Sequence, residues 1–293
     1  MRSDNERVPG GSALRTIDHA LRGRIIILDT ITRCEGNAAA GDVVVVGSFA
    51  GAMSLGFALE IGVRGLVAHD AGVGRDAAGV SGLPLADCLG VPAAAVAAHS
   101  ARIGDGESVY ADGFVSHVNR VAAAFGVVAG QKAADAAFAM LAAPPGAPSP
   151  EPIVDRSQRI VLATPTGRVV LVDSMLFAGM HNRNDVICAG SHGGRVNMAR
   201  ALEIGPRGAL FSDGGGARDG SGVDGLALLD AADVPAAAVD ATRARIGDPA
   251  STWRDGVVSA RNDTARRAGV TLGQPAGAAA RAMLERARGQ RET

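Results

Sequence analysis

Carboxylate and guanidinium side chains recur at one spacing in two separate parts of this 293-residue chain. Asp70 precedes Arg75 and Asp76, and the same spacing returns 143 positions later in a segment that ends with Arg218 and Asp219. Carboxylate oxygens bind divalent cations such as Mg²⁺ or Mn²⁺, and a guanidinium binds a carboxylate or phosphate through paired hydrogen bonds. The pattern predicts Asp76 and Asp219 as metal ligands and Arg75 as a ligand for a small anionic metabolite. The alternative is a loop in which Asp caps turns and Arg forms a surface ion pair.

A glycine motif at 47–51 also recurs, at 190–194. Each copy follows an apolar run and precedes helical periodicity, so backbone N–H groups at the start of the helix would face an anion. The second copy adds a hydroxyl and an imidazole, and we predict Ser191 and His192 as catalytic. The substrate-binding candidates of this motif are Gly190, Gly193 and Gly194. The alternative is that glycine only permits a tight turn.

Histidines are distributed unequally between the two copies. His69 and His117 belong to the first copy, whereas the histidine of the glycine motif, His192, belongs to the second. If the copies pack as a pseudo-dimer, one composite site joins His192 with His69, Asp70 and Asp76, and these imidazoles move protons near neutral pH. We therefore predict His69 and Asp70 as catalytic. The alternative is a set of unrelated histidines.

Two further segments are shared by both copies. The sequence Ala-Arg-Ile-Gly-Asp contains Arg102 in the first copy and Arg245 in the second, and either arginine binds an anion or braces the copies against each other. The segment 116–119 contains His117 and Asn119, which we predict as substrate-binding. For Asn119 the alternative is a helical position where its amide bonds only to neighbouring backbone.

These motifs lie in a tandem duplication. From Glu60 and Glu203 onward the copies align without a gap to Leu141 and Leu284, and a little over half of the paired residues are identical. Apolar β-branched runs such as 43–46 predict strands, and apolar residues at helical spacing in 53–61 predict a helix. We predict an α/β fold of two homologous β-β-α-β-α-β-α-α domains, with one helix spanning 105–125.

The predicted organisation of the chain has five parts. They are an N-terminal arm or short helix at 1–22, a first repeat domain at 23–142, a proline-rich linker at 143–157, a second repeat domain at 158–286 and a tail at 287–293.

Composition restricts the class of partner. The net charge is −1, which argues against a general nucleic-acid binder, and no apolar run is long enough to span a bilayer. We therefore expect a cytoplasmic protein without nucleic-acid or membrane partners that forms a homo-oligomer. The three cysteines have no metal-binding spacing and are predicted to be small buried hydrophobes.

Two resemblances follow from these motifs. The segment from Gly41 through Val67 to Asp70 and Arg75-Asp76 resembles the core of the regulator-of-RNase-E-activity/class II hydroxymethylglutarate aldolase family. That resemblance implies that the arginine contacts pyruvate and the final aspartate helps to hold a divalent metal. Each whole repeat also resembles short uncharacterised bacterial single-domain proteins, which implies no activity.

The sequence therefore predicts an enzyme that acts on a small carboxylate- or phosphate-bearing metabolite between the two repeats. It would be a lyase in which a metal polarises a carbonyl, or a hydrolase in which Ser191 or metal-bound water attacks. The alternative is a non-catalytic small-molecule-binding or scaffold protein that forms a symmetric oligomer.

Overall fold

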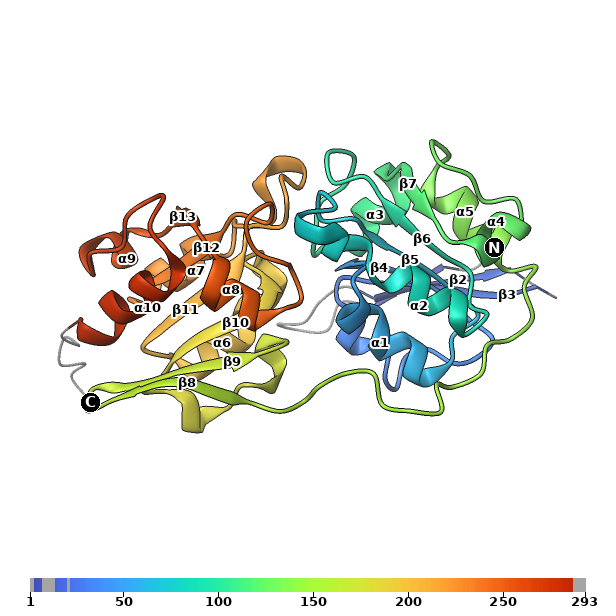
Figure 1. Ribbon diagram of the computed structural model, residues 1–293. Helices are drawn as coiled ribbons and strands as arrows, with labels where there is room; N and C mark the ends of the chain where they lie inside the picture. Colours follow the sequence, from blue (N-terminus) through green and yellow to red (C-terminus); the bar gives the residue numbers. More distant parts are fainter. Residues whose placement is uncertain (1–2, 7–13, 20–21, 287–293) are drawn as a thin grey trace. The chain divides into compact units, whose positions relative to one another are not determined.

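The computed structural model describes residues 3–6, 14–19 and 22–286, and in this part the chain divides into two compact units (Figure 1). The first unit extends to Asp155 and also contains residues 214–222 and 245–247. The second unit contains residues 156–213, 223–244 and the chain from 248 onward. The predicted tail at 287–293 lies outside the described residues, as does part of the predicted arm.

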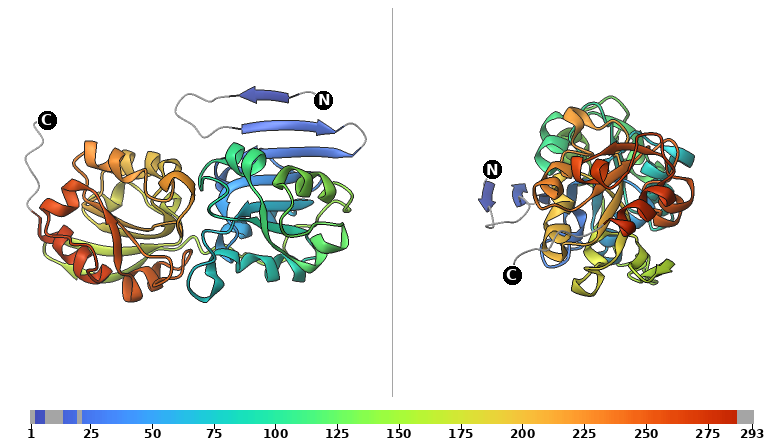
Figure 2. Two further views of the ribbon diagram at one scale, coloured as in Figure 1. Left: turned by 90° about the horizontal axis from the view of Figure 1, so that it is seen from above. Right: turned by 90° about the vertical axis from the view of Figure 1, so that its left-hand side faces the viewer.

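Within the described residues, the sheet of the first unit has seven strands whose spatial order is their order along the chain. They are β1 (Ser3–Glu6), β2 (Leu14–His19), β3 (Gly23–Leu28), β4 (Val43–Phe49), β5 (Gly65–His69), β6 (Ala93–Val96) and β7 (Val115–Val118). Strands β3 to β6 are parallel, whereas β1, β2 and β7 are antiparallel to their neighbours. Figure 2 shows β1 and β2 continuing the sheet beyond β3.

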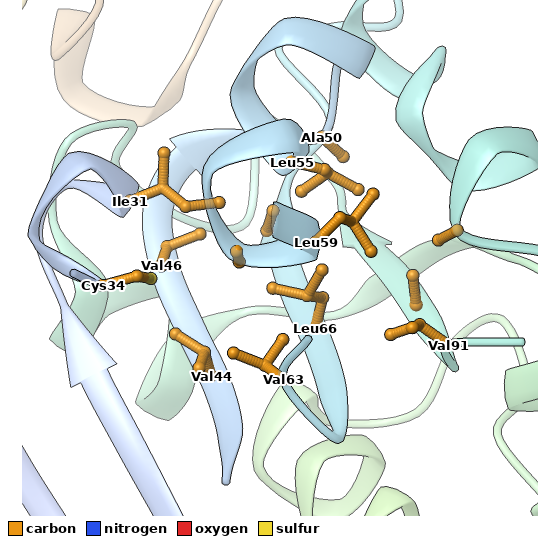
Figure 3. Close-up of a cluster of buried hydrophobic side chains, with 14 of the residues drawn as sticks. Ile31, Cys34, Val44, Val46, Ala50, Leu55, Leu59, Val63, Leu66 and Val91 are labelled. Atoms are coloured by element: carbon orange, nitrogen blue, oxygen red, sulfur yellow. The ribbon is translucent and has the colours of Figure 1, made fainter. Parts of the chain in front are cut away.

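Helices cover both faces of this sheet. On one face, α1 (Ala52–Ile61) and α2 (Gly82–Cys88) pack on alternate strand residues, and Leu55 and Leu59 of α1 meet Val44, Val46 and Leu66 (Figure 3).

On the other face, the intervening strand residues Val43, Val45 and Val67 pack against α3 (Gly106–Asp112) and α5 (Ala133–Met140). Because both faces are buried, the parallel strands carry apolar residues on both sides, and this explains the apolar runs 25–28, 43–46 and 93–96.

The second unit repeats this architecture with a six-stranded sheet in the order β13-β12-β11-β10-β9-β8. Its strands are β8 (Arg159–Thr164), β9 (Gly167–Val172), β10 (Val186–His192), β11 (Gly208–Ser212), β12 (Ala236–Val239) and β13 (Val258–Arg261). Helices α6 (Met198–Ile204) and α7 (Leu226–Ala231) share one core with this sheet, and α8 (Pro249–Asp255) and α10 (Ala276–Glu285) share another. The α/β class is thus confirmed.

An Arg–Asp ion pair occurs at equivalent positions in the two units. Arg24 of β3 donates from two nitrogens to Asp42, at 2.9 and 2.7 Å, and Arg168 of β9 donates to Asp185 at 2.9 and 2.8 Å. Asp42 and Asp185 are buried, so a two-point guanidinium contact offsets the cost of burying the carboxylate.

Two predicted elements are wrong. The single helix expected at 105–125 is α3, then strand β7, then α4 (Arg120–Ala124), so the order β-β-α-β-α-β-α-α lacks this strand and one of the two helices. Apolar residues in β7 fit a helical period as well as a strand, but the backbone is extended from Gly113 onward and β7 pairs with β6 at the sheet edge. Residues 14–19, expected to be a loose arm or short helix, form β2.

Loops from the second repeat complete the core of the first unit. Ala217 and Ile246 pack with Phe49, Ala71 and Ile103 in a buried apolar cluster. No helix in the described parts of the chain is both long enough and apolar enough to cross a bilayer.

Candidate functional site

The loop of residues 70–77 follows β5 and is anchored at its start by His69. The Nδ1 atom of His69 accepts a hydrogen bond from the Ala71 N–H at 3.0 Å, so Nε2 carries the hydrogen and donates to the Ala101 carbonyl, also at 3.0 Å. Burial lowers the pKa of His69 and favours the neutral ring. Both nitrogens of this predicted catalytic residue therefore hold backbone, and the arrangement favours a role in positioning the loop.

Asp70 holds three separate segments together. Its Oδ1 accepts from the N–H groups of Gly72 at 2.8 Å and Ala98 at 2.9 Å. Its Oδ2 accepts from the Ser116 hydroxyl at 2.8 Å, and the Ser116 Oγ lies 3.0 Å from Nδ1 of His117. The buried carboxylate is therefore a fixed acceptor at the end of β5.

Backbone strain is concentrated in the 70–77 loop. Ala71, Val73, Asp76 and Ala77 have φ of 47°, 62°, 53° and 55°, in the left-handed region that disfavours residues with a Cβ atom. At the first, second and fourth of these positions the second repeat has Gly214, Gly216 and Gly220, with φ of 74°, 74° and 68°. The first repeat thus holds non-glycine residues in a strained backbone conformation. In the second repeat, glycine adopts the same conformation with little strain.

We expect Ala77→Gly to raise the free energy of unfolding by about 1 kcal/mol, because it removes left-handed strain at an exposed residue. The reverse change in the second repeat, Gly220→Ala, should lower it by about the same amount, since a Cβ atom there meets nothing within 4 Å and adds only strain. Urea unfolding of both variants measures these effects. If the two substitutions changed the free energy of unfolding in the same direction, the result would contradict backbone strain at Ala77.

Two guanidinium groups lie beside Asp76. Arg245 Nε is 2.8 Å from Asp76 Oδ2, and Arg75 Nε is 3.6 Å from the same oxygen. The three side chains are between 38% and 56% exposed, so a solvent-borne anion has access to the cluster. All three belong to the first unit.

Asp219 has an equivalent environment. Arg102 lies 2.7 Å from its Oδ2 and Arg218 lies 3.8 Å from it. Arg218 also donates to Asp112 at 3.1 Å and to the Ser100 carbonyl at 3.3 Å. Arg102 and Arg245 therefore each join a segment of one repeat to a loop of the other within the first unit.

The donor set has the chemistry of a Mg²⁺ or Mn²⁺ site only in part. Mg²⁺ keeps several waters and takes one or two carboxylates, so a single exposed Asp76 suits it, but Oδ2 already accepts from Arg245. Among the residues that the structure describes, no three His, Cys, Asp or Glu side chains gather as metal ligands.

The glycine motif of the second unit places Ser191 and His192 at the end of β10. His192 Nδ1 accepts from the Gly194 N–H at 3.1 Å. The Ser191 hydroxyl is buried without a hydrogen-bond partner, whereas its counterpart Ser48 accepts from the Ile31 N–H at 2.9 Å.

The other glycines of the motif shape the turn that follows. Gly190 lies within β10, Gly193 donates from its N–H to the Ser212 carbonyl at 2.9 Å, and Gly194 begins the short 3-10 turn before α6. Because His192 belongs to the second unit and His69 and Asp70 to the first, their joint site stays a prediction.

Asn119 caps a helix and links it to the sheet. Its Oδ1 accepts from the N–H groups of Ala122 at 2.8 Å and Ala93 at 3.0 Å, and its Nδ2 donates to the Val91 carbonyl at 2.9 Å. Asn262 makes the same three bonds in the second unit. This buried, duplicated arrangement favours the backbone-bonding alternative over substrate binding.

The cysteines differ in accessibility, because Cys34 and Cys188 are buried as predicted whereas Cys88 is exposed. Burial raises the pKa of the Cys34 and Cys188 thiols to about 12. We expect a thiol reagent at pH 8 to modify Cys88 rapidly and the other two only after unfolding. Cys88→Ser should remove the fast phase of modification. A second rapidly modified thiol would contradict the burial of Cys34 and Cys188.

Sequence reasoning missed two residues that hold the loops. The Ser221 hydroxyl accepts from the Ile103 N–H at 2.9 Å, and the Asp112 carboxylate accepts from the Arg218 guanidinium at 3.1 Å. The counterpart of Ser221 is Ala78, so the repeat gave no signal for it, whereas the pairing of Asp112 depends on tertiary contact.

Comparison with known proteins gives no match to a family model, to a curated protein or to a solved structure.

Proposed function

We propose that the chain is a cytoplasmic enzyme that acts on a small carboxylate- or phosphate-bearing metabolite at the 70–77 loop. The observation that carries the proposal is the strained backbone of this loop. Left-handed φ at Ala71, Val73 and Ala77 is unfavourable, and such conformations persist where the surrounding structure enforces them, commonly at functional sites. The second repeat has glycine at each of these positions and so stores less strain.

The strained loop presents charged groups that suit an anion. Arg75 and Arg245 converge on Asp76, and a guanidinium can bind a carboxylate or phosphate through two parallel hydrogen bonds. An incoming carboxylate would compete with Asp76 for these guanidinium groups. The resemblance to the aldolase family implies the same role for Arg75 and lyase chemistry with a divalent metal at Asp76.

Calorimetric titration with pyruvate, in the presence and absence of Mg²⁺ and Mn²⁺, tests the proposal. We expect binding, and we expect Arg75→Ala to weaken it about tenfold or more, because a hydrogen bond to a charged group contributes about 1.5–3 kcal/mol. Arg218→Ala is the matched control, because Arg218 lies in the equivalent loop of the second repeat, where glycine occupies the three strained positions. Absence of pyruvate and phosphate binding to the wild-type chain would overturn the proposal.

The second candidate is a non-catalytic scaffold, and the paired contacts Arg102–Asp219 and Arg245–Asp76 favour it. In that case the chain forms a symmetric homo-oligomer. A thermal-shift screen with metals and keto acids would then be flat. Light scattering of the wild-type chain would report the mass of the assembly, and a monomeric mass would contradict this candidate.

A further inference from the structure

Three polar side chains of the first unit form a continuous hydrogen-bonded chain. Asp70 lies at the start of the 70–77 loop, and Ser116 and His117 lie on strand β7. The Ser116 Oγ is 2.8 Å from Asp70 Oδ2 and 3.0 Å from His117 Nδ1. His117 ends this chain as a partly buried imidazole.

The positions of the hydrogens follow from the donors and acceptors present. The Ser116 hydroxyl has one hydrogen and two acceptors within reach, Asp70 Oδ2 at 2.8 Å and the Ala95 carbonyl at 3.2 Å. The shorter bond to a carboxylate is the stronger of the two. A hydroxyl that donates to Asp70 has no hydrogen left for His117, and the bond between Oγ and Nδ1 then takes its hydrogen from Nδ1. In the neutral ring this leaves the lone pair on Nε2.

Comparison with the second repeat shows which of these contacts both repeats share and which occurs only in the first. Ser259 donates to Asp213 at 2.9 Å and lies 3.4 Å from the Ala238 carbonyl, as Ser116 does with its counterparts. The residue after Ser259 is Ala260. The Asp–Ser bond therefore forms without a histidine, and the imidazole is an addition of the first repeat.

His69 does not offer an equivalent base. Its two nitrogens bind the backbone of Ala71 and Ala101, and its side chain is fully buried. In His117, by contrast, the hydrogen bond to Ser116 holds Nδ1, and this bond also orients Nε2 on the other side of the ring.

We propose that Asp70 and Ser116 are positioning residues that hold His117 with its hydrogen on Nδ1, so that Nε2 serves as the base of the 70–77 site. This inference rests on the proposed function. A C–H or O–H bond of the bound anionic substrate breaks, its electron pair stays on the substrate, and Nε2 takes the proton. The resulting imidazolium donates from Nδ1 to Ser116, and the Asp70 carboxylate accepts from the Ser116 hydroxyl. The proton returns from Nε2 to the product, so the ring ends as it began.

Nitrogen-15 NMR of the histidine rings in the full chain tests the positioning without any ligand. We expect neutral wild-type His117 to carry its hydrogen on Nδ1 and Ser116→Ala to shift it toward Nε2. Ser259→Ala is the matched control and should leave His117 unchanged. Ala260→His should create a second ring with its hydrogen on Nδ1, because Asp213 and Ser259 are already in place.

A wild-type His117 with its hydrogen on Nε2, or no change in Ser116→Ala, would overturn the inference. Pyruvate titration of the same samples separates it from the proposed function. Loss of the Nδ1 hydrogen with intact pyruvate binding overturns only the role of His117. A retained Nδ1 hydrogen without any anion binding overturns the proposed function, and with it the assignment of Nε2 as its base.

Discussion

Replacing Gly215 with alanine is expected to lower the free energy of unfolding of the first unit by roughly 3 kcal/mol or more. A Cβ atom at Gly215 would lie 1.9 Å from the Ala71 carbonyl oxygen and 3.0 Å from the Gly72 Cα. These neighbours are backbone atoms of the strained loop, so relief requires the two loops to separate. The backbone of Gly215, with φ of 65°, adds left-handed strain to the clash.

Gly216→Ala provides a control at the next position. Gly216 also has positive φ, 74°, but a Cβ atom there meets nothing within 4 Å. We therefore expect a loss of only about 1 kcal/mol from backbone strain. Chemical denaturation of both variants, with hydrogen exchange of residues 70–77, measures the difference. Equal losses would show that the close approach of Ala71 and Gly215 is absent in solution.

The second large effect is expected for Asp70→Ala. This change removes the acceptor of two backbone N–H groups and of the Ser116 hydroxyl at a buried site. Each unsatisfied buried donor costs about 1–3 kcal/mol, so we expect a total loss of roughly 3 kcal/mol or more.

Asp76→Ala tests whether this loss is specific to the buried acceptor. Asp76 is 56% exposed, and its ion pair with Arg245 is a surface contact, for which about 1 kcal/mol or less is expected. Urea unfolding of both variants gives the comparison. A larger loss for Asp76→Ala than for Asp70→Ala would contradict the roles that the structure gives to the two carboxylates.

These two aspartates lie in one motif but in different environments. Both were predicted as functional, Asp70 as catalytic and Asp76 as a metal ligand. The structure makes Asp70 the fixed acceptor that orders the loop and Ser116, whereas Asp76 lies exposed between guanidinium groups.

Much of the fold could be predicted from the sequence. Apolar β-branched runs such as 43–46 indicated the buried parallel strands, and the apolar period of 53–61 indicated α1. Strand β7 could not be predicted, because four residues satisfy either period and only pairing with β6 at the sheet edge decides between them.

The sequence by itself determined the duplication, the α/β class and the repeated Asp, Arg and Gly positions, because identity and local periodicity are properties of the chain alone. Only the tertiary structure decided that Arg245 pairs with Asp76 and Arg102 with Asp219, and that Ser116 links Asp70 to His117. Such pairs join residues as many as 169 positions apart, and a local pattern does not specify which distant loops meet. The strain in the 70–77 loop is likewise a tertiary property, because φ at Ala71 and Val73 is enforced by packing against their own intrinsic preference.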